Sequence, residues 1–237
     1  MRFRRGEPIS RRKEEVLPHT SQRELEKPRS KSVVREYAEA IVIAILLALV
    51  IRAFVIQAFK IPSGSMKTTL LVGDHILVSK FTYGIKIPFT DNELVHFSSP
   101  ERGDIVVFEY PVDPSKDFIK RVIGLPGDTV RIHNKQVYVN DKPLNEPYVV
   151  HSDDKVLPAS VSPRDNMEPI IVPPNKLFVM GDNRDESYDS RFWKFVDFDA
   201  LRGEAFIIYW SWHRDGHFTL NPDQSYIRWN RIGKWLY

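Results

Sequence analysis

The chain contains no cysteine, which excludes disulfides, thiolate zinc sites and a cysteine nucleophile. Seven histidines are scattered along it, and only His213 and His217 have a spacing like that of metal ligands. That pair flanks Asp215-Gly216, a turn signal, so a helical zinc site is not expected. No glycine-rich phosphate loop is present, and no His/Asp pair suggests a catalytic triad. We therefore expect no metal and no cofactor.

Basic charge is scarce outside the N-terminal arm. The net charge is +3, and residues 1–36 hold eleven Lys and Arg against six Asp and Glu, which leaves −2 on the rest of the chain. A nucleic-acid-binding domain carries basic charge on its folded body, so no nucleic-acid partner is expected. Residues 1–35 also have too few apolar side chains for a core. We interpret them as a basic arm.

The chain also lacks a long uninterrupted apolar segment. The run Ala40–Ile51 has 12 residues, whereas a membrane-spanning helix needs ~20. Spanning therefore requires Glu39 near one interface and Arg52 reaching toward the other. Because the segment is apolar all round and follows a basic arm, we predict one N-terminal transmembrane signal anchor over residues 36–59.

The segment has two alternative interpretations. A buried core helix is the simpler reading of an apolar helix. A cleaved signal peptide is disfavoured, because the leading arm is long and no small-x-small pattern follows within a few residues. With an anchor, the basic arm is cytoplasmic and the remainder lies on the outer, periplasmic side of the cytoplasmic membrane.

From residue 60 onward the pattern is that of a mostly β fold. Short apolar runs are bounded by Gly, Pro, Asp and Asn. Residues 131–139 predict a hairpin with 133–135 at its turn. Residues 140–175 are polar and proline-rich, like an insertion or lid on the β body. The predicted strands are His75–Val78, Asp104–Glu109, Phe118–Ile123, Thr129–Ile132, Gln136–Val139, Lys176–Met180 and Ala205–Trp210.

The first candidate for chemistry is Ser63-Gly64-Ser65, directly after the apolar segment. Gly64 permits an unusual backbone that can present Ser65 and leave amides free. A nucleophilic serine also needs a base and an oxyanion hole. Taken alone, the motif indicates a turn more often than a nucleophile.

The second candidate is Lys120. In a strand it shares a face with Phe118 and Val122, both apolar. Burial there disfavours the ammonium and lowers the pKa, which makes lysine a possible general base. The alternative is a lysine whose stem covers apolar surface while its ammonium stays in water.

The third candidate is the acid- and arginine-rich segment 181–193. An EF-hand calcium loop starting at Asp182 fails, because Arg184 is at its third position and Ser187 at its sixth. Two arginines among the acids indicate an ion-pair network instead, with Ser187 as a possible partner for a buried amine.

Together these segments resemble bacterial type I signal peptidases. The similar stretches are 61–70, 73–80, 102–108, 119–128 and 181–193, in this order, and the resemblance covers about residues 35–212. It implies a signal-peptidase-like β body, shared with autoproteases, over residues 60–128 and 176–237, with a cap at 129–175. It also implies a membrane-bound serine endopeptidase that removes signal peptides of exported preproteins after small residues, with membrane lipid as a further partner.

The resemblance also implies the role of each residue. Ser65 is the expected nucleophile, neutral Lys120 the general base in an acyl-enzyme route, and Ser63 an oxyanion donor beside the Ser65 N–H. Ser187 is expected to orient Lys120. Support of the dyad is expected from Asp182, Arg184, Asp189 and Arg191. Substrate binding is expected from Ile61, Pro62, Met66, Leu70, Phe118 and Ile119.

Two positions depart from the family pattern. Thr68 stands where the family usually has Pro, and Lys194 where it usually has Gly. If position 194 needs a positive φ, lysine is strained there. The departures leave open a membrane-anchored binding module without activity. A soluble autoproteolytic repressor is disfavoured, because residues 1–36 contain no helix-turn-helix pattern. The sequence leaves the oligomeric state open.

Overall fold

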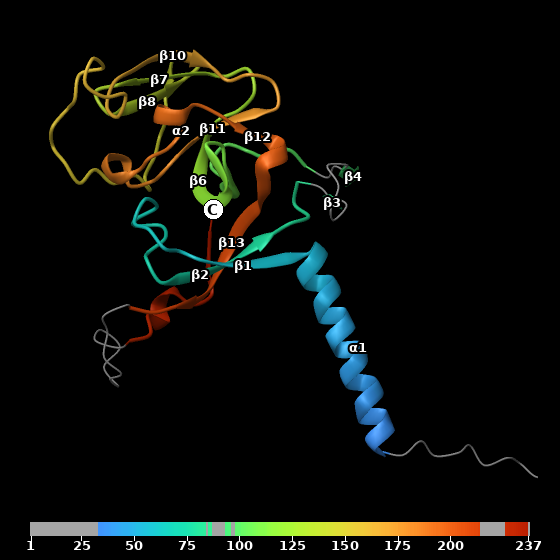
Figure 1. The fold of residues 1–237 in the computed structure, drawn as a ribbon. Helices are drawn as coiled ribbons and strands as arrows, with labels where there is room; N and C mark the ends of the chain where they lie inside the picture. The colour runs from blue at the N-terminus through green and yellow to red at the C-terminus, as the bar shows by residue number, and fades with distance from the viewer. Residues whose placement is uncertain (1–32, 84, 87–92, 96–97, 214–225, 237) are drawn as a thin grey trace, which may run out of the picture. The chain divides into compact units, whose positions relative to one another are not determined.

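The computed structural model describes residues 33–83, 85–86, 93–95, 98–213 and 226–236. Most of the predicted basic arm, residues 1–32, therefore lies outside the described residues. Figure 1 shows the order of the helices and strands along the chain. The chain divides into two compact units after Ile43. The β elements all belong to the second unit, Ala44–Tyr237.

Helix α1, Val33–Phe54, corrects the predicted transmembrane segment 36–59. The helix ends at Phe54, and residues 56–60 form strand β1 instead. Among the described residues, no helix combines the length and apolar character needed to cross a membrane. The reason is charge: Glu36 and Glu39 near one end and Arg52 near the other restrict the apolar run to the residues between them.

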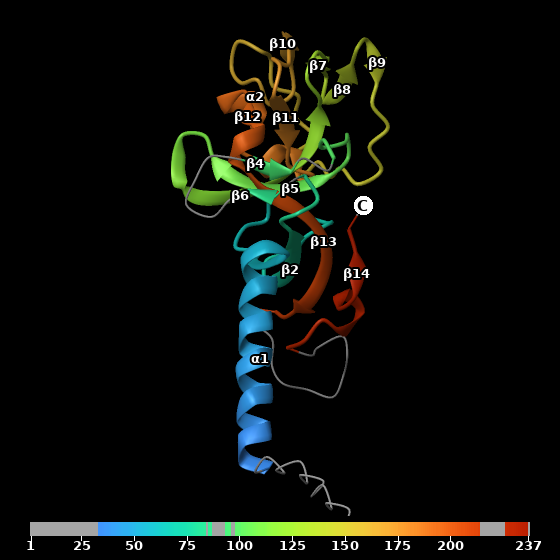
Figure 2. The same ribbon diagram turned by 90° about the vertical axis from the view of Figure 1, so that its right-hand side faces the viewer.

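The main sheet is antiparallel and contains the strand that carries Lys120. Its order is β1-β2-β13-β5-β6-β11-β12, and β14 pairs with β13 (Figures 1 and 2). The long strand β6 lies between β5 and β11, so its backbone is fixed on both sides. The strands are β1 Ile56–Lys60, β2 Asp74–Ser79, β5 Ile105–Tyr110, β6 Asp113–Gly124, β11 Lys176–Met180, β12 Val196–Asp197, β13 Leu201–Ser211 and β14 Lys234–Trp235.

Short elements connect these strands. The strands β3 (Ile85–Lys86) and β4 (Glu93–Val95) pair with each other. One turn of helix, α2, spans Ser190–Trp193, and Asp189 caps it by accepting from the Arg191 amide. Three 3-10 turns complete the described elements: η1 Arg184–Glu186, η2 Phe198–Ala200 and η3 Trp229–Arg231.

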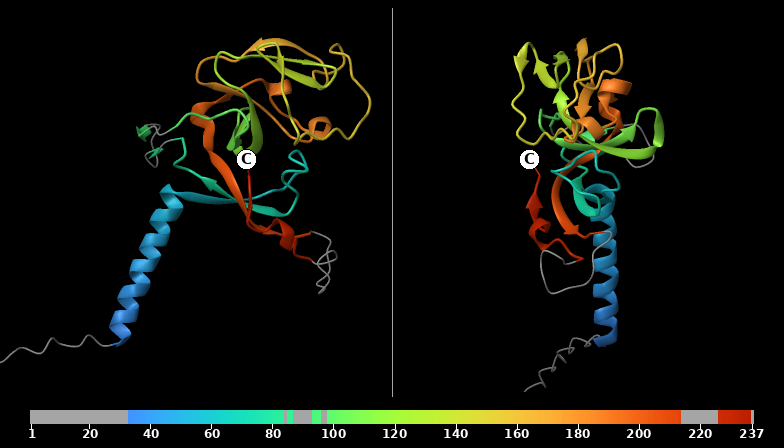
Figure 3. Two further views of the ribbon diagram at one scale, coloured as in Figure 1. Left: turned by 180° about the vertical axis from the view of Figure 1, so that it is seen from behind. Right: turned by 90° about the vertical axis from the view of Figure 1, so that its left-hand side faces the viewer.

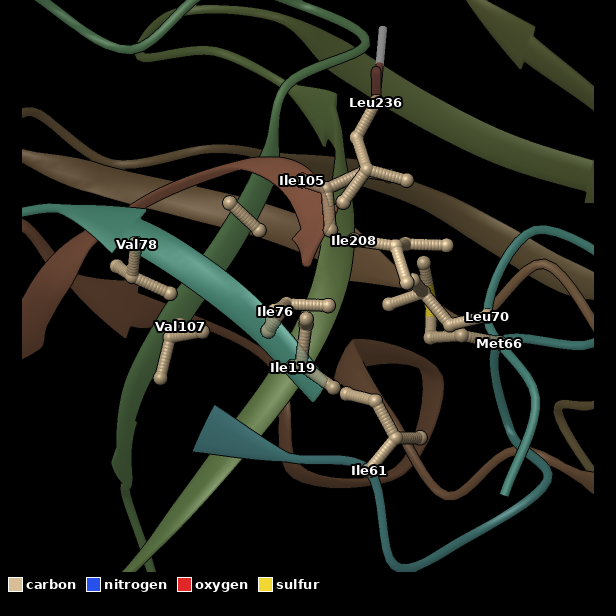
Figure 4. Close-up of a cluster of buried hydrophobic side chains, with 11 residues drawn as sticks. Ile61, Met66, Leu70, Ile76, Val78, Ile105, Val107, Ile119, Ile208 and Leu236 are labelled. Carbon is tan, nitrogen blue, oxygen red and sulfur yellow. The ribbon is translucent and has the colours of Figure 1, made fainter. Parts of the chain in front are cut away.

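One hydrophobic cluster lies beneath the loop between β1 and β2. Alternate residues of β2, Ile76 and Val78, are fully buried, as expected for a strand with one face on a core. Met66 and Leu70 from the loop pack into the same cluster, which Figure 4 shows together with Ile208 of β13. The loop is therefore anchored at several points by apolar burial.

A second sheet, of order β10-β7-β8-β9, is built from residues within the predicted cap. Figure 3 shows it from two further sides. The predicted hairpin is confirmed with a tighter turn, because His133 still pairs with Gln136. Asn134 and Lys135 both have positive φ, 48° and 69°, as a two-residue hairpin turn requires. The strands are β7 Thr129–His133, β8 Gln136–Val139, β9 Lys142–Pro143 and β10 Met167–Ile171.

All seven predicted strands lie on observed ones. The runs Gln136–Val139 and Lys176–Met180 match β8 and β11 residue for residue. The largest difference is β6, which begins at Asp113 rather than Phe118. Its polar first half lacks the apolar pattern, and its pairing with β5 extends it. The mostly β class is confirmed, and the division into body and cap stays a prediction.

Candidate active site

Ser65 lies in the loop between β1 and β2. Three apolar residues of this loop point into the core: Ile61, Leu70 and Met66, the last of which follows Ser65 directly. Their burial fixes the loop on both sides of the serine. Backbone bonds tighten it further: the Lys67 amide donates to the Gly64 carbonyl at 3.1 Å. Ser65 is 9% exposed, so its hydroxyl is held at the edge of the protein interior.

Lys120 on β6 points at this serine. Its Nζ lies 2.8 Å from Ser65 Oγ and donates to the Ile119 carbonyl at 2.9 Å. The side chain is 4% exposed, and the Phe118 ring centroid is 5.4 Å from Nζ. Residues 55 positions apart thus form a direct, buried serine–lysine contact.

The pKa of Lys120 is lowered from 10.5 to about 8. Desolvation by burial is the main cause, because a low-dielectric environment disfavours the ammonium. The carboxylates of Asp189 and Asp182 oppose the shift, and Arg191 adds to it. With this pKa about a tenth of Lys120 is the neutral amine at pH 7, and this form can accept a proton.

Asp189 organises one side of the site. It is fully buried and accepts from Arg191 Nε and Nη2, both at 2.8 Å, and from the Gly181 amide at 3.0 Å. Burial alone raises the pKa of Asp189, but the Arg191 charge and these hydrogen bonds outweigh it and hold the pKa below its usual value. The Ser187 hydroxyl donates to Asp189 Oδ2 at 2.7 Å. The predicted orientation of Lys120 by Ser187 stays a prediction.

Asp182 and Arg184 pair with residues outside the segment 181–193, whereas Asp189 and Arg191 pair within it. Asp182 accepts two bonds from Arg121, at 3.0 and 2.8 Å, and one from the Thr69 hydroxyl at 2.6 Å. Arg184 pairs with Glu146. Arg121 was missed, although strand alternation places it on the face opposite Lys120, where a buried cation needs its own partner. Glu146 carried no sequence signal.

Gly181 was also missed as part of the site. A Cβ atom there would lie 2.3 Å from Ser187 Oγ and 2.5 Å from the Ser65 carbonyl oxygen. Real Cβ atoms do not approach other atoms so closely, so only glycine fits without displacing one of the two serines. The glycine that begins the segment 181–193 was the available signal.

The predicted substrate-binding residues fall into two groups. Ile61, Met66, Leu70 and Ile119 are buried in the cluster of Figure 4. Phe118 is partly buried, and Pro62 and the predicted oxyanion donor Ser63 are exposed. A cavity of about 520 Å³ adjoins the loop. It is lined by Lys60, Ile61, Pro62, Val72, Gly73, Trp212 and Tyr226.

Both departures from the family pattern are placed by the structure. Lys194 has φ +74° and an exposed side chain, so the condition under which lysine is strained at this position is met. Its backbone amide closes α2 by donating to the Ser190 carbonyl. Thr68 is exposed beside the nucleophile loop, and the peptide bond before it is cis.

Comparison with known proteins settles the family. The profile described as "Signal peptidase, peptidase S26" matches residues 34–210. The chain belongs to the signal peptidase family, peptidase S26. It is a serine peptidase of the signal peptidase I type, whose reaction is the removal of signal peptides. These comparisons favour an enzyme over the binding module without activity that the sequence leaves open.

Two curated relatives bear names of this family. The chain is 38% identical over 217 residues to a protein named signal peptidase I of Pseudomonas aeruginosa, covering 79% of this chain and 76% of that one. It is 37% identical over 220 residues to a probable signal peptidase I-2 of Synechocystis sp., covering 90% and 89%. A crystal structure of a signal peptidase I from Enterococcus faecalis is 31% identical and covers 45% of this chain and 97% of that one, with a TM-score of 0.37.

Proposed function

We propose that this peptidase cleaves with a Ser65 nucleophile and a Lys120 general base. One observation carries the proposal: Lys120 Nζ lies 2.8 Å from Ser65 Oγ in a buried position that lowers its pKa to about 8. A base within hydrogen-bond reach, with a pKa near the working pH, is what activation of a serine hydroxyl requires.

Acylation begins when the neutral Lys120 amine takes the Ser65 proton and Oγ attacks the scissile carbonyl carbon. The Ser65 N–H and the Ser63 hydroxyl donate to the resulting oxyanion. As the intermediate collapses, the C–N bond breaks and the Lys120 ammonium returns its proton to the leaving amine, which releases the mature protein. The signal peptide stays attached to Ser65 as an ester.

Deacylation repeats these steps with water. Neutral Lys120 takes a proton from water, and the hydroxide attacks the ester carbonyl. The ester bond breaks, the Lys120 ammonium returns its proton to Ser65 Oγ, and the signal peptide leaves as a carboxylic acid that loses its proton to solvent. Support of the dyad comes from Asp189, which binds Arg191 and Ser187, and from Asp182 and Arg184, which pair with Arg121 and Glu146.

The proposed substrate is a signal peptide of an exported preprotein with small residues of the Ala-x-Ala type before the cleaved bond. Ile61, Met66 and Ile119 support this choice, because they fill the space beside the dyad as part of a packed core. A packed interior yields little to larger side chains, so we expect the surface over these residues to accept small ones.

We also propose that membrane lipid contacts α1, and that cleavage takes place at the outer face of the cytoplasmic membrane. The support is exposure: Ile41, Ile45 and Leu49 are each more than half exposed. An exposed apolar surface of this kind indicates an interaction site.

The test of lipid contact by α1 is flotation with phosphatidylethanolamine–phosphatidylglycerol vesicles. The parent should float, and the chain with Ile45→Asp and Leu49→Asp should not, whereas matched changes at exposed Val156 and Val161 should have no effect. Equal flotation of all three would contradict lipid contact by α1.

The dyad is tested by incubating the parent, Ser65→Ala and Lys120→Met with a preprotein bearing an Ala-x-Ala site. Both variants should lose at least about 10³-fold in kcat. Lys142→Met, which changes an exposed lysine in the same way, should cleave like the parent. Mass spectrometry of a quenched reaction should show the acyl group on the parent and none on Ser65→Ala. Cleavage by both dyad variants at the parent rate would refute the mechanism.

A further inference from the structure

Asn183 contacts the backbone on both sides of Ser65. Its side-chain Nδ2 donates to the Gly64 carbonyl at 3.1 Å, and its backbone N–H donates to the Ser65 carbonyl at 3.1 Å. These carbonyls belong to the two peptide units that flank the serine. One residue therefore holds both peptide planes that meet at Ser65.

The Gly64–Ser65 peptide unit is the one that matters for chemistry. Its N–H is the Ser65 amide, the proposed oxyanion donor. A trans peptide is planar, with C=O and N–H pointing in opposite directions. Fixing the Gly64 carbonyl toward Asn183 therefore aims the Ser65 N–H away from Asn183. The Lys67 amide donates to the same carbonyl at 3.1 Å and reinforces this orientation.

The orientation of the Asn183 amide is itself determined by its partners. Besides the Gly64 carbonyl, Nδ2 donates to Glu186 Oε2 at 3.1 Å. A flipped amide would bring Oδ1 against two acceptors, which is repulsive. Oδ1 is buried without a hydrogen-bond partner among the described residues, and the side chain is 3% exposed. The residue thus keeps an unsatisfied acceptor in order to present a donor to the loop.

The Asn183 backbone is held from the cap side. Val150 forms a parallel bridge with it, because the Val150 amide donates to the Asp182 carbonyl and the Arg184 amide donates to the Val150 carbonyl. The residues on either side of Asn183 are also anchored by ion pairs, to Arg121 and Glu146. A donor fixed in this way can impose its position on the nucleophile loop.

We propose that Asn183 is a positioning residue that aims the Ser65 N–H at the oxyanion. This inference rests on the proposed function, in which Ser65 is the nucleophile. Asn183 acts through the Gly64–Ser65 peptide and has no contact of its own with the reacting atoms.

The test compares Asn183→Ala with Asn166→Ala. Asn166 is the matched control because its Nδ2 also donates to a carbonyl, that of Leu157 at 2.9 Å, within the cap. Removal of an oxyanion-hole donor costs about 10²–10³ in kcat, so misaiming one should lower kcat by about 10- to 100-fold. The KM and the pH midpoint of the rate should stay at the parent values, since the dyad is intact.

A second readout isolates the oxyanion. A peptide aldehyde forms a tetrahedral adduct on Ser65, whereas the matching peptide alcohol binds without one. Asn183→Ala should weaken inhibition by the aldehyde by the same factor as kcat and leave inhibition by the alcohol unchanged. Asn183→Leu, which nearly keeps the size, loses the donor and adds no charge beside Glu186, should behave similarly if Asn183→Ala folds poorly.

The outcomes separate this inference from the proposed function. If Ser65→Ala cleaves like the parent, the proposed function fails. If Ser65→Ala is inactive but both Asn183 variants keep kcat and aldehyde inhibition within about twofold, the positioning role alone is overturned. It is also overturned if both Asn183 variants unfold while Asn166→Ala stays folded, because Asn183 is then a folding residue.

Discussion

Replacing the buried base by an apolar side chain should make the protein more stable at neutral pH. Lys120→Met keeps the length of the side chain and removes its charge. The folded pKa of about 8 lies below the unfolded value of 10.5, so the folded chain binds fewer protons in this range. Stability then rises with pH, and the cost of burying the lysine is fully present below about pH 8.

The magnitude follows from the difference of 2.5 pKa units, which corresponds to about 3 kcal/mol of destabilisation by Lys120 at pH 7. The methionine avoids this cost. It also removes the hydrogen bonds to Ser65 and the Ile119 carbonyl, a loss of about 1 kcal/mol. The net gain at pH 7 is therefore about 2 kcal/mol. For a chain of this size it corresponds to a rise of about 4–8 °C in Tm.

The assay is urea unfolding of the parent and of Lys120→Met at pH 7 and at pH 10.5, in the same detergent. Near pH 10.5 the lysine is neutral in the folded state and half neutral in the unfolded state, so the gain should fall to zero or reverse. Lys142→Met serves as the control, because an exposed lysine contributes no such dependence. A Lys120→Met variant that is less stable than the parent at pH 7, or whose gain is the same at both pH values, would refute the reasoning.

Three further predictions concern the same site and its surroundings. The kcat/KM of the parent should rise about tenfold from pH 7 to pH 9 with a midpoint near pH 8, because Lys120 must be neutral to accept a proton. A flat profile over this range would argue against Lys120 as the general base. Gly181→Ala should lower kcat by at least tenfold and the free energy of unfolding by about 1–3 kcal/mol, because its Cβ would collide with Ser187 and the Ser65 carbonyl. Steady-state kinetics measure the first effect and urea unfolding the second, and a fully active variant would contradict the packing. Lys194→Gly should stabilise the protein by about 1 kcal/mol in urea unfolding, because φ is +74° there and the side chain is exposed; no change or a loss would show that this backbone is not strained.

Local pattern was enough to predict seven of the fourteen strands among the described residues. Apolar runs such as Gln136–Val139 and Lys176–Met180 lie between turn residues and became strands with the same bounds. The end of α1 was less predictable, because no proline or glycine separates the helix from Ile56–Lys60. It pairs with β2 along its whole length, and that pairing is tertiary information.

The partners of the buried charges were harder to predict than the charges themselves. Acids and arginines in the segment 181–193 indicated ion pairs within it, and Asp189 with Arg191 fits that reading. Asp182 instead pairs with Arg121, and Arg184 with Glu146, across 61 and 38 positions. Sequence spacing carries no information about such pairs, since the topology of the sheet and of the cap determines them.

The neighbours Lys120 and Arg121 show how partners decide the chemistry of a buried cation. Both are almost fully buried on one strand, and alternation sends their side chains to opposite faces. Arg121 meets the Asp182 carboxylate with two hydrogen bonds, so its permanent charge is compensated. The hydrogen-bond partners of Lys120 are a hydroxyl and a carbonyl, which compensate a charge poorly. Lysine, unlike arginine, can release its proton, so the same burial that requires an ion pair on one face produces a neutral base on the other.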